Sequence, residues 1–482
     1  MFIGLDLGTS GVRALLVDGE GVVVASADHG LQVSHPHSGW SEQNPTDWVE
    51  ASHQALQDLS AQVPAEMALV RGIGLSGQMH GATLLGGDGA VLRPCILWND
   101  TRSHAQAAKL DAKADVRALS GNIVFPGFTA PKLMWVAERE PEVFAQVATV
   151  LLPKDYLSFW LTGRATSDMS DSAGTSWLDV GARQWSDRLL EASKMRRDQM
   201  PDVIEGTEVV GVIRPELAQD LGLPADVQIV AGGGDNAAAA CGVGALREGD
   251  GFVSLGTSGV LLAARDGFHP DPGSAVHTFC HAVPDRWYQM GVMLAATDSL
   301  NWLAGITGES PADLTAELSD LRAPSKVRFL PYLSGERTPH NDSSVRGAFT
   351  GLDIATDRAE LTQAVLEGVS FGLRDSLEAL RGTGAELPSL LAIGGGTGSR
   401  YWVELLATVL GLPLQLPAQG EFGAALGAAR LAICGVTGAD PLQVMTKPDI
   451  AETIDPNPQQ TAAFDEAYAA FNSSFPALKA MP

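Results

Sequence analysis

A six-residue segment occurs twice in this chain, and the repeat constrains the fold more than any other feature. Residues 7–12, Leu-Gly-Thr-Ser-Gly-Val, recur letter for letter as residues 255–260, about half of the 482-residue chain later. The same offset places the Asp-Gly pair at 18–19 onto the Asp-Gly pair at 266–267. Each copy follows apolar, β-type residues and runs through further apolar residues to its Asp-Gly turn, which is the pattern of a β-hairpin. The repeat therefore predicts two structurally similar halves, each opening with a strand, a Gly-Thr-Ser-Gly turn and a second strand.

Strand and helix patterns alternate along the rest of the chain, which predicts a layered α/β fold. A polar, glycine-containing stretch at 247–250 precedes the second hairpin, so we place the boundary of the halves there. The tail at 447–460, rich in Pro, Asp and Gln, is expected to be a surface excursion before a last helix. The expected elements are helices at 46–59, 361–380 and 401–410, strands at 68–75 and 389–393, and a hairpin at 82–92.

The charge of the chain limits its partners. There are 32 Lys and Arg residues against 57 Asp and Glu, a net charge of −25, which repels phosphate backbones and anionic lipid. The N-terminus lacks the basic region of a secretion signal, and no apolar stretch reaches the roughly 18 residues of a membrane span. We therefore expect a cytoplasmic protein that binds neither nucleic acid nor a membrane. Small anions stay possible ligands, because local backbone N–H groups can hold a phosphate.

Three motifs that could bind a nucleotide or a metal are absent or incomplete. The chain has no Gly-Lys pair, which excludes a Walker A loop. Residues 72–77, Gly-Ile-Gly-Leu-Ser-Gly, fit a dinucleotide motif but precede a hairpin where that motif requires a helix. His277 and His281 flank Cys280, yet a packed interior strand explains them better than zinc. The four cysteines are far apart and are expected to be buried thiols: Cys95, Cys241, Cys280 and Cys434.

The duplicated glycine turns are candidate phosphate sites. Backbone N–H groups of a tight turn converge on one concavity, and Thr or Ser hydroxyls add donors. A single such turn would be an ordinary hairpin, but two identical turns opening two related halves can clamp one polyphosphate from both sides. The residue before the repeat is Asp6 in the first half and Ser254 in the second. A carboxylate beside phosphates implies Mg²⁺ at Asp6, the alternative being a carboxylate that caps its own turn.

Two glycine-rich loops follow predicted strands. After the strand at 227–231, three glycines at 232–234 lead to Asp235 and Asn236, which precede a helix of small residues at 237–246. Asp235 could cap this helix, but three glycines also allow close approach of a ligand to a carboxylate presented into a cleft. A second loop, Gly-Gly-Gly-Thr-Gly-Ser at 394–399, follows a strand in the second half. A flat ring such as adenine can lie against its backbone.

With these features the chain resembles the FGGY family of carbohydrate kinases, from Phe2 to about Ala432. Arg139 departs from the first family signature, where Glu, Asn, Gln or His is usual. Within the family, the segments at 77–81, 96–100 and 330–337 are typical of members that phosphorylate D-xylulose, whereas glycerol kinases carry an Arg-Glu pair at 79–80. The residues that fit the first signature are Gly127, Thr129, Lys132, Leu133, Trp135, Val136 and Glu138, and those that fit the second are Gly347, Phe349, Gly351, Leu352, Glu360, Leu361, Ala364, Val365, Leu366 and Glu367.

The resemblance implies two duplicated actin-like, ribonuclease H-like α/β domains with a cleft between them, at 1–246 for sugar and metal and 247–482 for nucleotide. It implies ATP-dependent phosphorylation of a sugar, with D-xylulose expected, and Mg²⁺ as the cation. Another pentulose or a pentitol is the alternative substrate, an actin-like chaperone or filament ATPase is the alternative class, and a homodimer stays open. The implied residues are Asp235 as general base, Asp6 for magnesium, Met79, His80, Asp235 and Asn236 for the sugar, Thr9, Ser10, Arg13, Gly256 and Thr257 for the phosphates, and Gly395 and Gly396 for the nucleoside.

Overall fold

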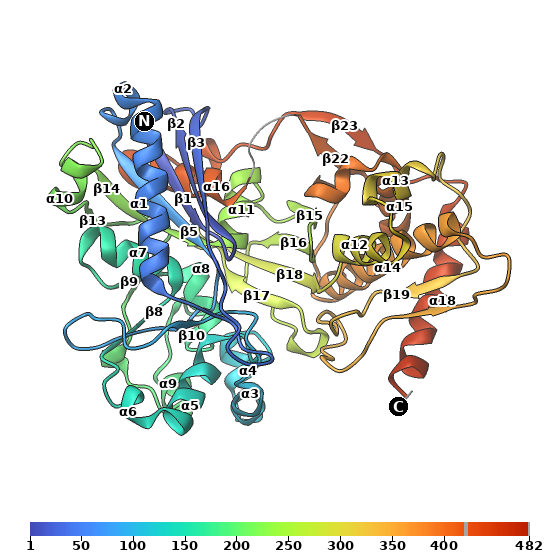
Figure 1. Ribbon diagram of the computed structural model, residues 1–482, viewed down its shortest axis with the longest axis horizontal. Coiled ribbons are helices and arrows are strands. Elements are labelled where there is room, and N and C mark those ends of the chain that lie inside the picture. The colour runs from blue at the N-terminus through green and yellow to red at the C-terminus, as the bar shows by residue number, and fades with distance from the viewer. Residues whose placement is uncertain (419–422, 481–482) are drawn as a thin grey trace.

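Two mixed β-sheets form the centres of two lobes. The structure is a computed structural model that describes residues 1–418 and 423–480, and Figure 1 shows the lobes side by side. The six-stranded sheet consists, in order, of β13 (Val209–Val212), β14 (Gln228–Gly234), β5 (Gly72–Gly77), β1 (Phe2–Leu7), β2 (Gly11–Val17) and β3 (Val23–Gly30). The seven-stranded sheet consists, in order, of β17 (His277–Cys280), β18 (Trp287–Met293), β16 (Gly259–Arg265), β15 (Gly251–Leu255), β21 (Leu390–Ile393), β22 (Leu414–Pro417) and β23 (Ile450–Ile454).

The duplicated hairpins open the two sheets in the same way, as the repeat predicts. In the first sheet β1 runs antiparallel to β2 and parallel to β5. In the second sheet β15 runs antiparallel to β16 and parallel to β21. Asp6 lies opposite Arg13 of β2 and Ser76 of β5, whereas Ser254 lies opposite Val260 and Ile393. The two halves therefore share one scaffold and differ in charge at one equivalent position.

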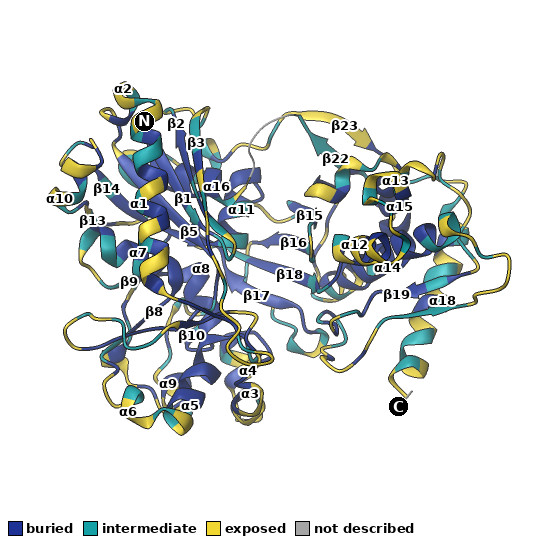
Figure 2. Ribbon diagram, in the orientation of Figure 1, coloured by how far each residue is buried: buried dark blue, intermediate teal, exposed yellow. Residues whose placement is uncertain are grey.

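Helices cover both sheets, and their buried faces meet the strands (Figure 2). In the first half they are α1 (Pro45–Gln62), α2 (Pro64–Met67), α3 (His104–Asp111), α4 (Val116–Ser120), α5 (Thr129–Arg139), α6 (Pro141–Phe144), α7 (Pro153–Thr162), α8 (Met169–Ser172), α9 (Asp187–Ala192), α10 (Pro215–Asp220) and α11 (Asp235–Val243). In the second half they are α12 (Thr297–Thr307), α13 (Pro311–Ala316), α14 (Arg358–Gly382), α15 (Arg400–Leu410), α16 (Ala424–Thr437), α17 (Pro441–Val444) and α18 (Thr461–Lys479). No helix among the described residues is long and apolar enough to cross a bilayer.

Short strand pairs brace the connections between these elements. They are β4 (Glu42–Gln43) with β7 (Cys95–Ile96), β6 (Thr83–Leu85) with β8 (Thr149–Leu151), β9 (Thr166–Asp168) with β12 (Asp202–Ile204), β10 (Leu178–Asp179) with β11 (Gln184–Trp185), and β19 (Arg328–Leu330) with β20 (Ala348–Thr350). All four cysteines are buried and free, as expected.

Helix α16 belongs to the second half of the sequence but packs on the first sheet, against β1, β5 and α11 (Figure 1). Glycines make this contact close: a Cβ on Gly4 would lie 1.8 Å from the carbonyl oxygen of Ala425, and one on Gly74 would lie 1.9 Å from that of Ala428. Any larger residue would push the helix away from the sheet. The chain therefore returns to its first lobe before it ends, while the division of the sequence at 246/247 stays a prediction.

The helices predicted at 46–59, 361–380 and 401–410 lie within α1, α14 and α15. The helix expected at 237–246 ends at Val243, and the hairpin expected at 82–92 has one strand, β6, which pairs with β8 and has only a single bridge, Leu85 to Val91, within that segment. The strand expected at 68–75 begins at Gly72, because Pro64 starts the short helix α2 just before it. The loop expected at 232–234 continues strand β14 to Gly234. The tail expected as a surface excursion contains β23, which pairs with β22 before the predicted last helix α18.

Candidate active site

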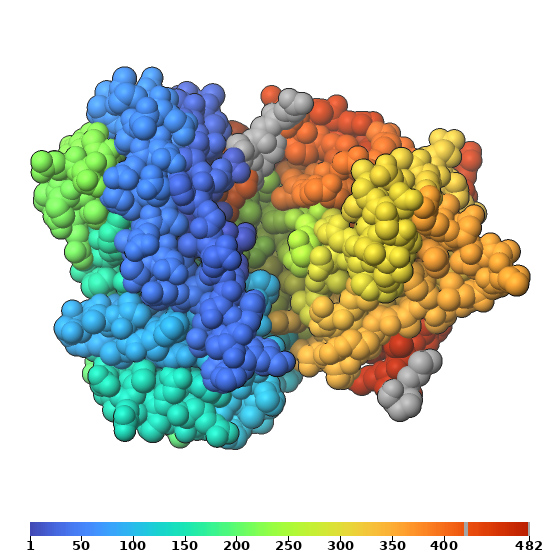
Figure 3. All heavy atoms as spheres, in the orientation of Figure 1, coloured from blue at the N-terminus to red at the C-terminus, as the bar shows by residue number. Residues whose placement is uncertain are grey.

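A cavity of about 330 Å³ lies between the two halves of the chain. Figure 3 shows the surface hollowed between the lobes. Aromatic, sulfur-containing, acidic and basic side chains meet in this cavity, which suits a small polar ligand with a carbon skeleton. The lining residues are Met79, His80, Trp98, Gly127, Phe128, Asp235 and Asn236 from the first half, and Ser254, Gly256, Ser258, Val260, His277, Met290, Val292, Leu294 and Arg337 from the second.

A larger cavity, of about 710 Å³, lies in the second lobe between α12, α13 and α15. Gly395 and Gly396 line it, as the sequence predicted for a nucleoside, and Gly395 has no atom within 4 Å of where a Cβ would stand. Thr297, which also lines it, donates from its backbone N and from Oγ1 to the carbonyl oxygen of Gly256. The second glycine turn, which lines the smaller cavity at Gly256, is therefore hydrogen-bonded to the wall of the larger one.

Asp235 begins helix α11 where strand β14 ends, and Gly234 rather than Asp235 is the N-cap residue. Its Oδ1 accepts hydrogen bonds from the backbone N of Asn236 at 2.7 Å and from Nδ2 of the same residue at 2.9 Å. Burial and the nearby charge of Asp6 raise the pKa of Asp235 to about 6. The carboxylate is thus ionised at neutral pH and basic enough to accept a proton.

Asp6 lies opposite Ser76 of β5, and the next residue of that strand, Gly77, pairs with Gly234 just before Asp235. Burial raises the pKa of Asp6 itself, and its Oδ1 is buried with no hydrogen-bond partner in the part of the chain that the structure describes. The turn-capping alternative needs this carboxylate to accept a hydrogen bond from a backbone N of its own turn, and Oδ1 accepts none. An orphaned carboxylate oxygen beside a second carboxylate fits a divalent cation such as Mg²⁺, which prefers oxygen ligands.

The first glycine turn is held beside the sugar-sized cavity by a hydrogen-bond network. Trp98 Nε1 donates to Thr9 Oγ1 at 2.9 Å, and Thr9 Oγ1 donates to Gln78 Oε1 at 3.0 Å. Gln43 Nε2 donates to the carbonyl oxygen of Thr9 at 2.8 Å. Ser10 is exposed at the tip of the turn. Gly256 of the second turn lines the cavity, whereas Thr9, Ser10 and Arg13 do not, and the first turn reaches the lining only through the hydrogen bond of Thr9 with Trp98.

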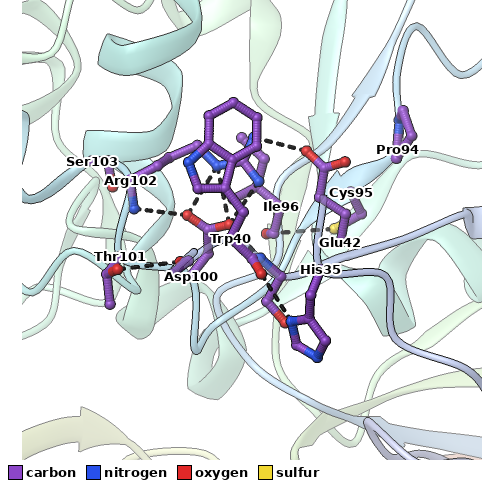
Figure 4. Close-up of polar contacts among 12 residues, drawn as sticks. His35, Trp40, Glu42, Pro94, Cys95, Ile96, Asp100, Thr101, Arg102 and Ser103 are labelled. Atoms are coloured by element: carbon purple, nitrogen blue, oxygen red, sulfur yellow. Dashed lines mark hydrogen bonds and ion pairs between the residues drawn. The ribbon is translucent and has the colours of Figure 1, made fainter. Parts of the chain in front are cut away.

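An ion-pair cluster fixes the loop that carries Trp98 (Figure 4). Arg102 lies 2.7 Å from Asp100 and 2.7 Å from Glu42, with both side chains of the Arg102–Asp100 pair almost fully buried. Its guanidinium carbon lies 3.6 Å from the ring centre of Trp40. Paired charges stacked on an aromatic ring hold a loop in one position. The Trp98 side of the cavity is thus rigidly supported.

His80 lines the cavity with a left-handed backbone, at φ 70°. Its Nδ1 lies 2.7 Å from the carbonyl oxygen of Gly174, and its ring stacks on Phe128 with centroids 4.5 Å apart. Burial lowers the pKa of His80 to about 3, so the ring is neutral. A neutral imidazole that donates from Nδ1 to a carbonyl has an unprotonated Nε2, which can only accept. His80 therefore offers the ligand one hydrogen-bond acceptor.

A buried cluster supports the strand end before Asp235. Ser170 Oγ accepts from the backbone N of Gly234 at 3.1 Å and donates to Asp168, which lies 2.7 Å from Lys154 Nζ. Asp155, Asp168 and Asp171 are close enough to share a metal, but Lys154 Nζ lies among them. Burial, with the neighbouring carboxylates, raises the pKa of Asp171 well above its usual value. We therefore interpret this cluster as a structural support.

The structure adds residues that the sequence patterns did not identify. Trp98, Phe128, His277 and Arg337 line the cavity beside Met79, His80, Asp235 and Asn236. His277 lies in a buried strand, as predicted, and also reaches the cavity. Trp98 and Arg337 fall in segments that resemble the family, but nothing in their spacing indicates a shared site. The larger cavity is also lined by residues that the sequence patterns did not identify, among them Asn301 of α12.

Comparisons with known proteins match the whole arrangement. The N-terminal domain of the FGGY family of carbohydrate kinases matches residues 1–242, and the C-terminal domain of the same family matches residues 251–436. Xylulose kinase of Escherichia coli (strain K12) is 46% identical over 482 residues, which cover 99% of each chain. Xylulose kinase of Klebsiella pneumoniae is 49% identical over 435 residues, 90% of this chain and 89% of that protein. The crystal structure of a xyloylose kinase from Brucella ovis is 56% identical, with a TM-score of 0.98 over 100% of this chain and 99% of the other.

Proposed function

This chain belongs to the FGGY family of carbohydrate kinases, and from that premise we propose that it transfers the γ-phosphate of ATP to the terminal hydroxyl of D-xylulose, giving D-xylulose 5-phosphate. Its fold is the two-domain fold of that family, of the actin-like ATPase type, as expected from the sequence. The observation that carries the proposal is the cavity in which Asp235 of the first half faces the glycine turn of the second. The names of the relatives support the choice of sugar.

In the proposed reaction Asp235 is the general base. Asn236 occupies Oδ1 of Asp235 with two hydrogen bonds, which leaves Oδ2 for the terminal hydroxyl of the sugar. As the O–H bond breaks, its proton passes to Oδ2, the sugar oxygen bonds to the γ-phosphorus, and the bond to the bridging oxygen breaks to release ADP. His80 accepts a hydrogen bond from another sugar hydroxyl, and Met79 packs against the carbon chain.

The phosphates are proposed to lie between the two glycine turns. Thr9, Ser10 and Arg13 would contact them from the first turn, and Gly256 and Thr257 from the second. Aligned phosphates and fixed donors supply most of the catalysis of phosphoryl transfer. Mg²⁺ held through Asp6 would neutralise phosphate charge. The nucleoside would lie against Gly395 and Gly396 in the larger cavity.

A substrate panel tests the proposal. We expect ADP release to be strongly stimulated by D-xylulose, and less by other pentuloses, pentitols or glycerol. The measurement is a coupled ADP assay at saturating MgATP, with the sugar phosphate identified by mass spectrometry. A preference for another pentulose or a pentitol would contradict the choice of D-xylulose but would still support ATP-dependent sugar phosphorylation. ATP hydrolysis that no sugar stimulates would favour the actin-like chaperone or filament class instead.

The His80→Asn variant tests the sugar side of the cavity. Asparagine tolerates the positive φ at this position better than alanine, so the fold is expected to be kept. Its shorter side chain leaves a sugar hydroxyl without its acceptor, and kcat/KM for D-xylulose should fall by about 10- to 100-fold. The Kd for ATP, measured by calorimetry without sugar, should not change. Unaltered D-xylulose kinetics in the folded variant would place the sugar elsewhere.

A further inference from the structure

Arg337 enters the sugar cavity from the second half, on the segment between β19 and β20. Its guanidinium carbon lies 4.5 Å from the ring centre of Phe125, and the Phe125 ring lies 5.0 Å from the ring of His277. The flat face of the guanidinium therefore packs on an aromatic wall. Because Arg337 lines the cavity, its N–H groups are available to a ligand there.

The guanidinium of Arg337 has no hydrogen-bond or ion-pair partner among residues 1–418 and 423–480, although it packs on Phe125. No carboxylate of these residues pairs with it, and no acceptor of theirs hydrogen-bonds to its side chain. The adjacent Glu336 does not pair with the guanidinium, and its Oε1 accepts instead from the backbone N of Leu294 at 3.1 Å and of Arg337 at 2.7 Å. Two other arginines do have such partners: Arg102 pairs with Asp100, and Arg183 pairs with Glu205. Arg337 is half-buried, and a guanidinium partly withdrawn from water without an acceptor is costly, which indicates that a ligand supplies one.

Arg337 and Asp235 line the same cavity, Arg337 on the wall formed by Phe125 and His277. After burial, which is the largest cause, the charge of Arg337 helps to lower the pKa of both His277 and His80. A sugar with its reacting hydroxyl at Asp235 can therefore also reach Arg337 within this cavity.

The chemistry of a 2-ketopentose defines that other end. Its furanose ring closes through the oxygen on C5, so a free C5 hydroxyl exists only in the open-chain form. The open chain carries a carbonyl at C2, whose oxygen accepts hydrogen bonds and donates none. A guanidinium donates and never accepts, so the two groups are complementary. A pentitol has a hydroxyl at C2 instead. Its oxygen can accept from the guanidinium, but its proton also needs an acceptor, which a guanidinium cannot supply.

We propose that Arg337 is a specificity-determining residue that binds the C2 carbonyl oxygen of the open-chain ketose and so selects a pentulose over the corresponding pentitols. The inference rests on the proposed function, because it takes the C5 hydroxyl as the group that Asp235 deprotonates. With this role for Arg337, both halves of the chain contribute to the sugar site: His80 of the first half is the acceptor, and Arg337 of the second half is the donor.

The test compares D-xylulose with xylitol and D-arabinitol, the two pentitols formed when its C2 carbonyl is reduced. In Arg337→Met, kcat/KM for D-xylulose should fall by about 10- to 100-fold, the effect of a lost charge-assisted hydrogen bond, while the values for both pentitols change by less than about threefold. The Kd of D-xylulose without ATP should rise in parallel. 1-Deoxy-D-xylulose keeps the C2 carbonyl, so its kcat/KM should fall by the same factor as that of D-xylulose.

Arg183→Met is the matched control, because Arg183 is also half-buried and stacked, over Trp287, but has a carboxylate partner. It should lower Tm and leave the ratio of D-xylulose to pentitol kcat/KM unchanged. Arg337→Met should keep or raise Tm, because it removes a charge that has no ion-pair partner among the described residues. Equal losses for D-xylulose and pentitols, or a lowered Tm with unchanged selectivity, would overturn the assignment and leave the kinase function standing. Wild-type protein that does not phosphorylate D-xylulose would overturn both.

Discussion

Asp235→Asn is expected to lose about 10²- to 10⁴-fold in kcat, the usual contribution of a general base. The amide keeps the size of the side chain and can still accept the hydrogen bond from the backbone N of Asn236. It cannot take the proton of the sugar hydroxyl. Affinity for ATP should be almost unchanged, because Asp235 faces the sugar. The measurements are single-turnover phosphorylation of D-xylulose and calorimetric titration with ATP.

The pH dependence of the wild-type protein gives an independent check on Asp235. Burial and the charge of Asp6 raise the pKa of Asp235 to about 6, and the base works only when ionised. kcat/KM should therefore fall as the pH drops below about 6, toward tenfold for each pH unit. In Asp235→Asn the residual rate should lose this dependence.

The same pKa shift predicts an effect on stability. A carboxyl whose pKa is raised on folding destabilises the folded state at a pH above that pKa, where it is ionised. Asp235→Asn should therefore raise Tm at pH 8, and the difference should shrink at pH 5. A variant that keeps more than half of the wild-type kcat would show that Asp235 is not the base. A lowered Tm at both pH values would show that its main role is to stabilise the start of α11.

The local patterns of the sequence predicted the scaffold well. The repeated turns, the strands around them and the long helix at 361–380 are determined by residues close in the chain, and all were confirmed. Packing partners are not determined locally. Nothing in residues 424–437 indicates that α16 covers the first sheet, since that contact depends on Gly4 and Gly74, which lie hundreds of residues earlier.

The residues of the candidate site also fall into those that local sequence patterns identify and those that depend on distant packing. The sequence identified Asp6 as a candidate because the equivalent residue of the second half is Ser254. It identified Asp235 because three glycines precede this carboxylate. Trp98 and Arg337 could not be identified, because each acts in the cavity only through elements from elsewhere. Trp98 needs the Arg102 cluster to hold its loop, and Arg337 needs β17 and the wall around Phe125 to face the sugar. The roles assigned to the site residues stay predictions until variants are measured.

Asp6→Ala is expected to weaken Mg²⁺-dependent ATP binding and turnover together, with a loss of about 10²-fold or more in kcat/KM for MgATP. Asp6 Oδ1 has no hydrogen-bond partner among the described residues, so its removal breaks no contact at that atom. The stability of Asp6→Ala at pH 8 should not be lower than that of the wild type. Burial raises the pKa of Asp6, so the ionised carboxylate destabilises the folded state at this pH. The measurements are ATP calorimetry at several Mg²⁺ concentrations, steady-state kinetics and Tm.

Ser254→Ala is the matched control, because Ser254 occupies the equivalent position before the second turn. It should change kcat/KM for MgATP by less than about threefold and leave the Mg²⁺ dependence of ATP binding as in the wild type, since a hydroxyl contributes no charge there. Equal losses from both variants would show that the two turns act only through their backbones and that Asp6 has no metal role. An effect confined to Asp6 would show that the duplicated halves diverged at this residue, one half keeping a neutral turn and the other gaining the carboxylate that phosphoryl transfer requires.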